Sequence, residues 1–579
     1  MSTPDSKEQL DAFIDTVRNH LSNGQLDQLM VIIHDEKNIQ QLKDTSWDVI
    51  PIITQYLNEK ESTSHELLKC CKGCLEEIAR KGNPEETLLE FLAEAEDLNN
   101  DVKFIAVLQP LSIVLLRLPK KRGQSMEWCF KTVQEHFKAL PEQNLCYNEE
   151  NVKVANKTKF IQRVRDLYLG AIPFYRCLVD EVCHHLKELD NDVMIQRKAL
   201  ISFLLQLLGK PYMFLDDTAM ESVELASKEI VGCLCDLVID PMIFMDFTEE
   251  EDDLFLMSGV CGSHISGLDS YLRTNKVPVQ SLAVLYYLIL SKRIHLDCVP
   301  CVYHPSFIFH HALHLACYLL KSSENVIIVK GLRLTEAVLM RLQDTLLAAR
   351  MLDLPIHYDF TKFLVNIMVY CPVKSTRILA INLFKTYLFK FDLKGQYLLL
   401  FNLHKSVDHS CSNLRGFLMT QIKEIIHRTL NENITSIYFT GKCLCDLMAL
   451  YCNVPQEPDT YLLEISDEVM SALNLIRFLI LRDKDDKTGI WTYLRTLEDG
   501  FFKKLSESLK YSREYYNRLE MEAKDSKEKF SVTVRNEELS LKSEDERLHA
   551  QNLFDLIEDI LERVKECLAE SRLMNTEAP

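Results

Sequence analysis

The sequence predicts an all-α fold in which helical pairs stack into an irregular solenoid. Apolar residues recur at spacings of three and four along almost the whole 579-residue chain, which is the period of an α-helix. Glycine is scarce, with 16 residues, and leucine, glutamate, lysine and isoleucine dominate, which favours helices. Several predicted helices are apolar on most sides and must be covered on most sides. Stacked helical pairs provide that cover, so we expect a repeat array of the HEAT/armadillo-like type.

The helices expected along the chain differ in how much apolar surface they carry. In the helix at residues 25–36, Leu26, Leu29 and Ile33 fall at spacings of three and four. Later helices are apolar nearly all round, and they are expected at residues 103–118, 198–209, 281–291, 331–342 and 377–390. A chain of this length exceeds what a single hydrophobic core can organise, so several domains or a repeat array are expected.

Proline punctuates the first half of the chain at intervals of half or whole helical hairpins. The positions are 51, 84, 110, 141, 173, 211, 241 and 278. This spacing is consistent with a repeat of about 40 residues. The alternative is that the prolines mark ordinary turns between the helices of an irregular all-α protein.

One acidic segment interrupts the helical pattern near the middle of the chain. Residues 245–255 are expected to form a solvated loop or the start of a helix. We place a domain division at this segment, between an N-terminal helical region at 1–245 and a C-terminal helical region at 256–579.

The last part of the chain combines an extended segment with a final helix. Phe530, Val532 and Val534 alternate with polar residues, which predicts a short extended arm near residues 530–536. A helix at residues 546–572 should then pack back on the array as a cap. Its expected apolar stripe consists of Leu553, Leu556, Ile557, Ile560, Val564 and Leu568.

The charge and the start of the sequence argue against nucleic-acid and membrane partners. The formal net charge of −19 repels phosphate backbones, and the compact basic cluster of Lys120, Lys121 and Arg122 is interpreted as a solvated loop. No apolar run reaches the ~18 residues that a membrane span needs. The polar, acidic start is not expected to be a signal peptide. The 19 cysteines lie in leucine-rich helical segments, as expected of reduced thiols in a cytoplasmic protein, with the nucleus as an alternative location.

The best candidate for metal chemistry lies at residues 298–314. Cys298 and Cys301 form a CxxC pair, and His310 and His314 are one helical turn apart, so these four residues could hold Zn²⁺. The interval between the two pairs is shorter than in a zinc finger, and the surroundings are apolar. We therefore predict no metal site and keep a metal-dependent or thiol enzyme as the rival hypothesis.

No other motif supports an enzyme. The sequence contains no GxSxG, no P-loop, no GxGxxG and no HExxH. A second CxxC pair, Cys71 and Cys74, is interpreted as buried thiols. We predict no catalytic residue and no cofactor, and we expect a binding surface instead.

The segment at residues 465–494 joins an apolar helix to a charged turn. Ser466 is expected to cap the helix, and Val469, Leu473, Ile476 and Ile480 form its apolar row. A second face carries one amide and one guanidinium group, Asn474 and Arg477. Burying these two without partners would cost several kcal/mol, so they either bond to a neighbouring helix or face a partner protein.

The charged turn leads to Trp491, which opens the next helix. One interpretation makes Trp491 a core plug between helices. The other makes it part of a recognition rim, because arginine and tryptophan are enriched where interfaces concentrate their binding energy. We predict a partner-binding region at roughly residues 410–579. Its predicted contact residues are Asn474, Arg477, Arg482, Asp483, Lys487, Trp491 and Arg495.

Five segments together resemble the glomulin family. They are SALNLIRFLILRDKDDKTGIWTYL in the stretch just described, GQLDQLMVIIHDEKN near the start, ENVIIVKGLRLTEAVLMRL and CPVKSTRILAINLFKTYLFKFDLKGQYLLLF in the middle, and LFDLIEDILERVKE in the last helix. The likeness follows the chain in order over most of its length. The resemblance implies a HEAT-like helical protein without enzymatic activity.

The resemblance also implies partners. Members of the family bind, through their C-terminal part, the RING domain of the RING-box subunit of cullin-RING ubiquitin ligases, and they cover the surface on which the ubiquitin-conjugating enzyme docks. They are also linked to an FK506-binding immunophilin and to a receptor tyrosine kinase. We therefore expect an inhibitor of cullin-RING ligases, with a general helical adaptor for the immunophilin or the kinase as the alternative. A solenoid similar to transport receptors would share the architecture but not these segments.

Overall fold

The computed structural model confirms the all-α solenoid. It describes residues 4–58, 64–140, 152–187, 190–250, 253–256, 265–343, 346–406, 411–434, 436–454, 462–525, 532–534, 537–539 and 544–576. Contacts group the chain into two compact units, Met1–Gln343 and Asp344–Pro579, called the first and second unit below. Within the described ranges, no helix combines the length and the apolar character that crossing a membrane requires.

The first unit is built from fifteen helices and one short hairpin in its described part. In chain order they are α1 (Pro4–Ser22), α2 (Leu26–His34), α3 (Ile39–Thr54), α4 (His65–Lys81), α5 (Pro84–Ala95), α6 (Asp101–Arg117), α7 (Arg122–Lys138), α8 (Val152–His185), α9 (Asn191–Leu207), α10 (Asp217–Ser222), α11 (Glu224–Leu237), β1 (Phe247–Glu250), β2 (Asp253–Leu256), α12 (Leu268–Thr274), α13 (Val279–Tyr286), α14 (Pro305–Leu320) and α15 (Asn325–Arg341).

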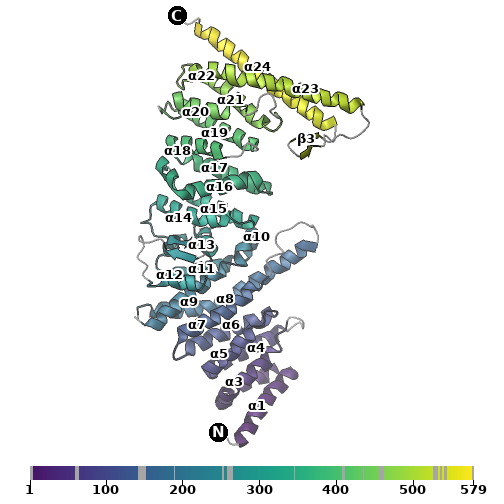
Figure 1. Ribbon diagram of the computed structural model, residues 1–579. Helices are drawn as coiled ribbons and strands as arrows, with labels where there is room; N and C mark the ends of the chain where they lie inside the picture. The colour runs from purple at the N-terminus through teal and green to yellow at the C-terminus, as the bar shows by residue number, and fades with distance from the viewer. Residues whose placement is uncertain are drawn as a thin grey trace. The chain divides into compact units, whose positions relative to one another are not determined.

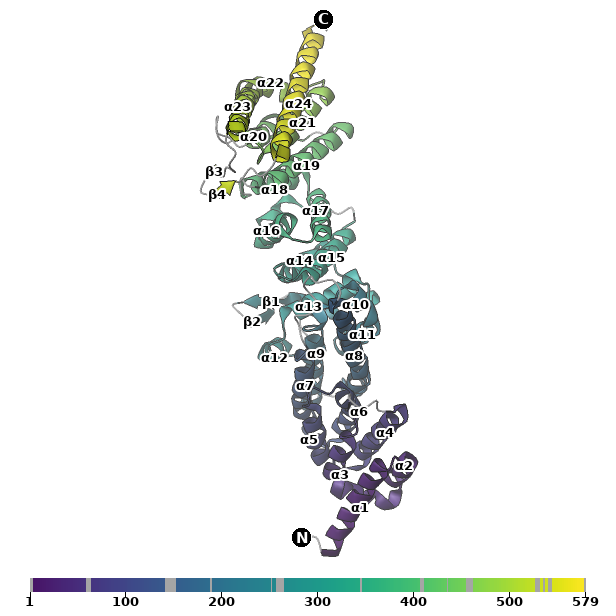
Figure 2. The same cartoon turned by 90° about the vertical axis from the view of Figure 1, so that its right-hand side faces the viewer.

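The helices of this unit form two layers. In one layer α3, α5, α7 and α9 contact one another in turn, and in the other α2, α4, α6, α8 and α11 do so (Figure 2). Helices such as α6 and α9 therefore have neighbours on several sides, which explains why their sequences are apolar nearly all round. Phe104, Leu108 and Leu111 of α6, for example, have no exposed surface.

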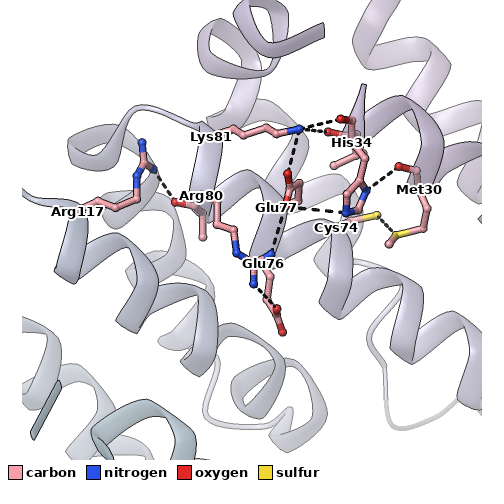
Figure 3. Close-up of polar contacts among 10 residues, drawn as sticks. Met30, His34, Cys74, Glu76, Glu77, Arg80, Lys81 and Arg117 are labelled. Carbon is pink, nitrogen blue, oxygen red and sulfur yellow. Dashed lines mark hydrogen bonds and ion pairs between the residues drawn. The ribbon is translucent and has the colours of Figure 1, made fainter. Parts of the chain in front are cut away.

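Polar side chains tie three consecutive helices of one layer together near their ends (Figure 3). Lys81 of α4 donates from Nζ to the carbonyl oxygens of Ile33 and His34 at the end of α2, at 3.3 and 3.0 Å. Arg117 of α6 donates to the carbonyl oxygen of Ala79 at 2.6 Å. Capping carbonyls of a neighbouring helix in this way satisfies acceptors that a helix end leaves unpaired. 

The cysteines of α4 match their predicted role as buried thiols. Cys71 and Cys74 have no exposed surface, and the Cys74 Sγ atom lies 3.5 Å from the Sδ atom of Met30 on α2. Burial raises the pKa of the Cys71 thiol to about 12, so this thiol stays protonated and unreactive. All seventeen cysteines in the described part of the chain are free thiols.

The prolines do not all separate helices, contrary to the expected spacing. Pro51, Pro110 and Pro173 lie inside α3, α6 and α8. A proline inside a helix removes one backbone hydrogen bond, and the packing of these helices on both sides offsets that loss. Pro84 does begin a helix, at the first position of α5, where its missing N–H group is not needed. Pro141 lies outside the described residues.

The acidic segment in the middle is a hairpin, which corrects the expected loop or helix start. β1 and β2 pair antiparallel, with Phe247 opposite Leu256 and Glu250 opposite Asp253. Phenylalanine and threonine favour strands, and the acidic residues gather where the chain reverses. Helices that follow the hairpin pack on a helix that precedes it, because α12 and α13 contact α9. The predicted division at 245–256 accordingly falls within the first unit.

The predicted solvated basic cluster is only partly solvated. Lys120 and Lys121 are exposed. Arg122 begins α7 and donates from Nη2 to the carbonyl oxygen of Leu116 at 2.6 Å. Arg122 therefore fixes the turn between α6 and α7.

The second unit continues the same architecture. Its elements are α16 (Pro355–Tyr370), α17 (Lys374–Phe389), α18 (Leu393–Ser406), α19 (Ser412–Asn431), α20 (Gly441–Tyr451), α21 (Ser466–Arg482), α22 (Ile490–Leu497), α23 (Lys503–Asp525), β3 (Val532–Val534), β4 (Glu537–Leu539) and α24 (Glu544–Thr576). One layer contains α18, α20 and α22, and the other contains α19, α21 and α24 (Figure 1). The short strands β3 and β4 pair antiparallel and confirm the extended arm. Phe530 of the predicted arm lies outside the described residues.

The final helix packs back on the array as predicted, and its buried stripe shares Ile557, Val564 and Leu568 with the expected one. α24 lies against α21 and α23. Leu556, an expected stripe residue, is 47% exposed. The buried stripe is Ala550, Phe554, Ile557, Leu561, Val564 and Leu568. These positions alternate spacings of four and three, as in a coiled-coil seam, and Phe554 buries the largest ring of the stripe.

Candidate functional site

Four predicted contact residues, Arg482, Asp483, Lys487 and Trp491, lie at two loops of the second unit that lie side by side. Asn474 and Arg477 lie farther back on α21, and Arg495 lies on α22. One loop connects α19 to α20 and the other connects α21 to α22. Arg482 donates from Nη2 to Asn431 Oδ1 at 2.8 Å, and Lys487 donates from Nζ to Asn433 Oδ1 at 3.1 Å. Below these side chains the Gly441 amide donates to the Thr488 carbonyl oxygen at 2.8 Å. We call the described residues of 431–440 and 481–491 the loop surface.

A close backbone contact explains the glycine between the charged turn and α22. Gly489 has a φ of +72°, in the left-handed region that favours glycine, and a Cβ atom added there would lie 3.4 Å from Gly441 Cα. The two loops therefore meet backbone to backbone. This contact holds the exposed side chains of both loops on one rigid support.

Asp483 organises the charged turn from inside. Its side chain is buried, and its carboxylate accepts hydrogen bonds from the Lys487 amide at 2.8 Å, the Thr488 amide at 2.7 Å and the Thr488 hydroxyl at 2.5 Å. Its carbonyl oxygen accepts from the Trp491 indole at 2.9 Å. A buried carboxylate that accepts three hydrogen bonds from one turn holds the backbone of that turn in place.

The predicted contact residues therefore divide into three groups by exposure. Asn474, Arg482, Lys487 and Arg495 are exposed, Arg477 and Trp491 are half-buried, and Asp483 is buried. Trp491 combines the two interpretations given for it, because its indole N–H is used inside the turn while part of its ring remains at the surface. Asp483 supports the surface from below and is not available to touch a partner.

The start of α21 differs from the expectation. Ser466 does not cap the helix, because its hydroxyl donates to the Leu463 carbonyl oxygen at 3.0 Å. The cap comes instead from Ser412 of α19, whose hydroxyl accepts from the Glu468 amide at 3.2 Å. The expected apolar row of α21 is confirmed, since Val469, Leu473, Ile476 and Ile480 are all buried.

Sequence reasoning missed three apolar side chains on the same two loops. Ile437 is 72% exposed, Leu481 is 48% exposed and Ile434 is 42% exposed. Large apolar groups beside arginine and tryptophan are typical of protein-binding surfaces. The signal in the sequence was the isoleucine pair within the otherwise polar stretch NENITSIY. It was overlooked because only tertiary structure brings that stretch beside the charged turn.

The charged turn gives a direct test of this local architecture. Replacing Asp483 with asparagine is expected to lower the free energy of unfolding by about 1–3 kcal/mol, because an amide cannot accept three hydrogen bonds from this arrangement of donors. Trp491 fluorescence, read in a background with Trp47 and Trp128 replaced by phenylalanine, should shift toward that of a solvated indole. Asp485→Asn, an exposed change in the same turn, is the matched control. Equal effects of the two changes would contradict the role of Asp483.

The rival metal site is not assembled as predicted. His310 and His314 do lie together on α14, with ring centroids 5.1 Å apart. Burial lowers the pKa of His314 to about 4, so this imidazole is neutral at physiological pH. Among the described residues, the one group of potential metal ligands that lies close together is His295, Asp297 and Cys298, and it includes neither histidine of α14 nor Cys301.

Comparison with known proteins gives three kinds of match. Residues 8–543 match the model of a family described as an uncharacterised protein family, YAP/Alf4/glomulin. Glomulin from Homo sapiens is 27% identical over 583 residues, covering 95% of this chain and 91% of the human protein. Glomulin from Mus musculus is 27% identical over 587 residues, with coverages of 95% and 91%. Among solved structures, a chain of the Kap95:Nup1 complex matches 83% of this chain and 58% of its own length at 14% identity, with a TM-score of 0.23.

Proposed function

Because the chain belongs to the YAP/Alf4/glomulin family, we propose that it is a non-enzymatic inhibitor of cullin-RING ubiquitin ligases. In this proposal the loop surface of the second unit binds the RING domain of the RING-box subunit in its complex with cullin. Binding covers the surface on which the ubiquitin-conjugating enzyme docks. The chain would act in the cytoplasm, with the nucleus as the alternative location.

The observation that supports this site most is the composition of the loop surface. It places the cations of Arg482 and Lys487 beside the exposed side chains of Ile437 and Leu481 and the edge of Trp491. Such a mixture of apolar, aromatic and guanidinium groups suits a protein partner. A specific complex buries more than about 1,000 Å² of total surface, so neighbouring exposed side chains such as Asn474 and Arg495 would join the contact.

The hydrogen bonds within the loop surface favour binding in a second way. Arg482 and Lys487 are held by the neutral amides of Asn431 and Asn433, not by carboxylates. Their positions are therefore restrained while their charges remain available to a partner. Restraining a side chain before binding reduces the entropy that association would otherwise remove.

Inhibition requires no chemistry from the inhibitor itself. A RING ligase positions a loaded conjugating enzyme and forms no covalent bond with ubiquitin. Occupying that docking surface is enough to stop chain formation. A rigid helical array without a catalytic site is suited to this task.

The test combines binding and activity on the same samples. The purified full chain should bind a RING-box–cullin complex in a calorimeter and suppress ubiquitin-chain formation, and excess conjugating enzyme should relieve the suppression. Changing both Arg482 and Lys487 to glutamate should weaken binding by about 100-fold, because two charges are reversed at the centre of the proposed contact.

A matched variant separates the proposed contact from the overall charge. Lys374→Glu with Lys565→Glu changes the net charge equally, at two exposed positions outside the loop surface. This control should bind as tightly as the unchanged chain. If both double variants bound equally well, the choice of surface would be wrong, and if the unchanged chain did not bind at all, the proposed function would be wrong.

The alternative is an adaptor for an FK506-binding immunophilin or a receptor tyrosine kinase. Exposed tryptophans in the first unit favour it, since Trp47 is 56% exposed and Trp128 is 49% exposed. Tryptophan is enriched at protein interfaces and among the residues that dominate binding energy. Trp47→Ala with Trp128→Ala should abolish adaptor binding and leave ligase inhibition unchanged, whereas the Arg482 and Lys487 changes should do the reverse.

A further inference from the structure

We propose that the first unit holds a Zn²⁺ site formed by His295, Asp297, Cys298 and Cys235. This site differs from the CxxC and histidine pairs that the sequence suggested. It is independent of the loop surface, and it would act on the structure of the first unit.

Three of the ligands come from one turn. His295, Asp297 and Cys298 each offer a ligand atom, and these atoms lie within 4.8 Å of one another. The turn is a short 3₁₀ helix, Leu296–Cys298, and the Cys298 amide donates to the His295 carbonyl oxygen at 3.1 Å. The backbone therefore gathers a nitrogen, an oxygen and a sulfur donor without contributions from long flexible side chains.

The fourth ligand comes from a helix that packs against this turn. Cys235 lies near the end of α11, outside that group, and its thiol is close enough to the thiol of Cys298 for the two to interact. A rotation of the Cys235 side chain would bring a fourth ligand to a cation held by the other three residues. The set of two sulfurs, one imidazole and one carboxylate suits tetrahedral Zn²⁺, whereas Mg²⁺ and Ca²⁺ prefer sites made only of oxygen.

A hydrogen bond identifies which nitrogen of His295 would be free to bind a metal. The Nε2 atom lies 3.1 Å from the Lys228 carbonyl oxygen of α11. A carbonyl oxygen can only accept, so Nε2 carries the proton and Nδ1 keeps the lone pair that a metal needs. Histidine ligands commonly donate their second ring N–H to a backbone carbonyl in this way.

The backbone at His295 and a neighbouring glycine allow the imidazole to take this position. His295 has a φ of +49°, in the left-handed region that residues with a side chain seldom adopt. Its ring packs against Gly232 of α11, where a Cβ atom would lie only 3.1 Å from Nε2. A larger residue at 232 would press against the imidazole beside its carbonyl partner.

Zinc bound at this site would cross-link α11 to the segment that follows α13. The free energy of binding would then add to the stability of the folded state, because the four ligands come together only in that state. The expected role is therefore structural, as a staple near the middle of the first unit.

The experiment uses the full chain, stripped of metal with a chelator and then titrated with Zn²⁺. Calorimetry should give one equivalent of tight binding, and the melting temperature should rise on adding Zn²⁺. Titration with Co²⁺ should produce the intense thiolate charge-transfer absorption and the visible bands of a tetrahedral site. Less than half an equivalent of bound metal would overturn the proposal.

Cysteine variants identify the ligands. Cys298→Ser and Cys235→Ser should each weaken Zn²⁺ binding by at least about tenfold, as expected when a metal site is disturbed, and should remove part of the Co²⁺ charge-transfer band. Cys301→Ser is the matched control, because Cys301 lies in the same segment and is exposed, whereas Cys235 interacts with the Cys298 thiol. Circular dichroism of the metal-free variants would show that they fold. Unchanged binding by both ligand variants, or an equal loss in Cys301→Ser, would refute the assignment.

Discussion

Replacing Arg415 with leucine is expected to lower the free energy of unfolding by about 3–5 kcal/mol, because it leaves a buried carboxylate without its cation. Arg415 of α19 and Glu468 of α21 are 4% and 6% exposed, and their closest nitrogen and oxygen atoms are 3.6 Å apart. Urea unfolding monitored by circular dichroism would measure the loss. The pair joins the two helices that support the loop surface.

The size of this loss should depend on pH in a definite direction. Burial raises the pKa of Glu468 from its ordinary value of 4.5 to about 7, although Arg415 opposes the shift. An acid whose pKa is raised on folding favours the folded state fully below pH 4.5, and that contribution disappears as the pH rises through 7. Without Arg415 the pKa should rise further, so the loss should be larger at pH 8 than at pH 5.

A control and a contradicting result complete this prediction. Arg563→Leu, an exposed change on α24, should alter stability by less than about 0.5 kcal/mol at either pH. An equal loss for Arg415→Leu at pH 5 and pH 8 would show that Glu468 does not change its protonation state in this range.

Asp101→Asn should destabilise the first unit by about 2–3 kcal/mol, because hydrogen bonds to charged groups are the stronger ones. The Asp101 carboxylate of α6 accepts from His136 Nε2 of α7 at 2.9 Å and from Arg163 Nη2 of α8 at 2.9 Å. The His136 ring is buried and stacks on Phe104 with centroids 3.7 Å apart. One carboxylate thus joins three helices, and thermal unfolding at pH 7 would measure its contribution.

The pH dependence of this second change has the opposite sign. Burial opposes ionisation of Asp101, but the hydrogen bonds from His136 and Arg163 outweigh it and hold its pKa below the ordinary 3.8. Such a group stabilises the fold above its ordinary pKa, and the contribution is lost as the pH falls through the lowered value. The difference in the free energy of unfolding between the unchanged chain and Asp101→Asn should therefore become smaller from pH 7 to pH 3. A difference that stays constant with pH would contradict this account. So would an equal pH dependence for the exposed control Asp11→Asn.

The regular helical periodicity made the architecture predictable from the sequence. The positions of chain reversals, and the face of the last helix that is buried, were not predictable. The apolar helices at 103–118 and 198–209 correspond to α6 and α9. The hairpin at 247–256 was missed because its acidic residues obscured a strand pattern four residues long. In the last helix, Leu553 and Phe554 each begin a plausible apolar stripe, and contact with α21 and α23 selects the second.

The position of the candidate site was predictable from the sequence, but the roles of its individual residues were not. The run of charges at 482–487 located the loop surface, but three aspartates in that run look alike in the sequence. Only Asp483 is buried, because its carboxylate meets the Thr488 amide and hydroxyl after the chain has turned. Likewise Ile437 became part of the candidate site only through the contact between Gly441 and Thr488.

The docking of α24 on α21 has a consequence for how the protein is made. A ribosome releases α21 and the charged turn well before it releases α24, so the flank of α21 is uncovered while the rest of the chain is still being synthesised. Folding of nascent chains proceeds from the N-terminus, and exposed apolar flanks are what chaperones recognise. A premature stop codon ahead of α24 would therefore leave every residue of the loop surface encoded and yet leave the flank of α21 permanently uncovered.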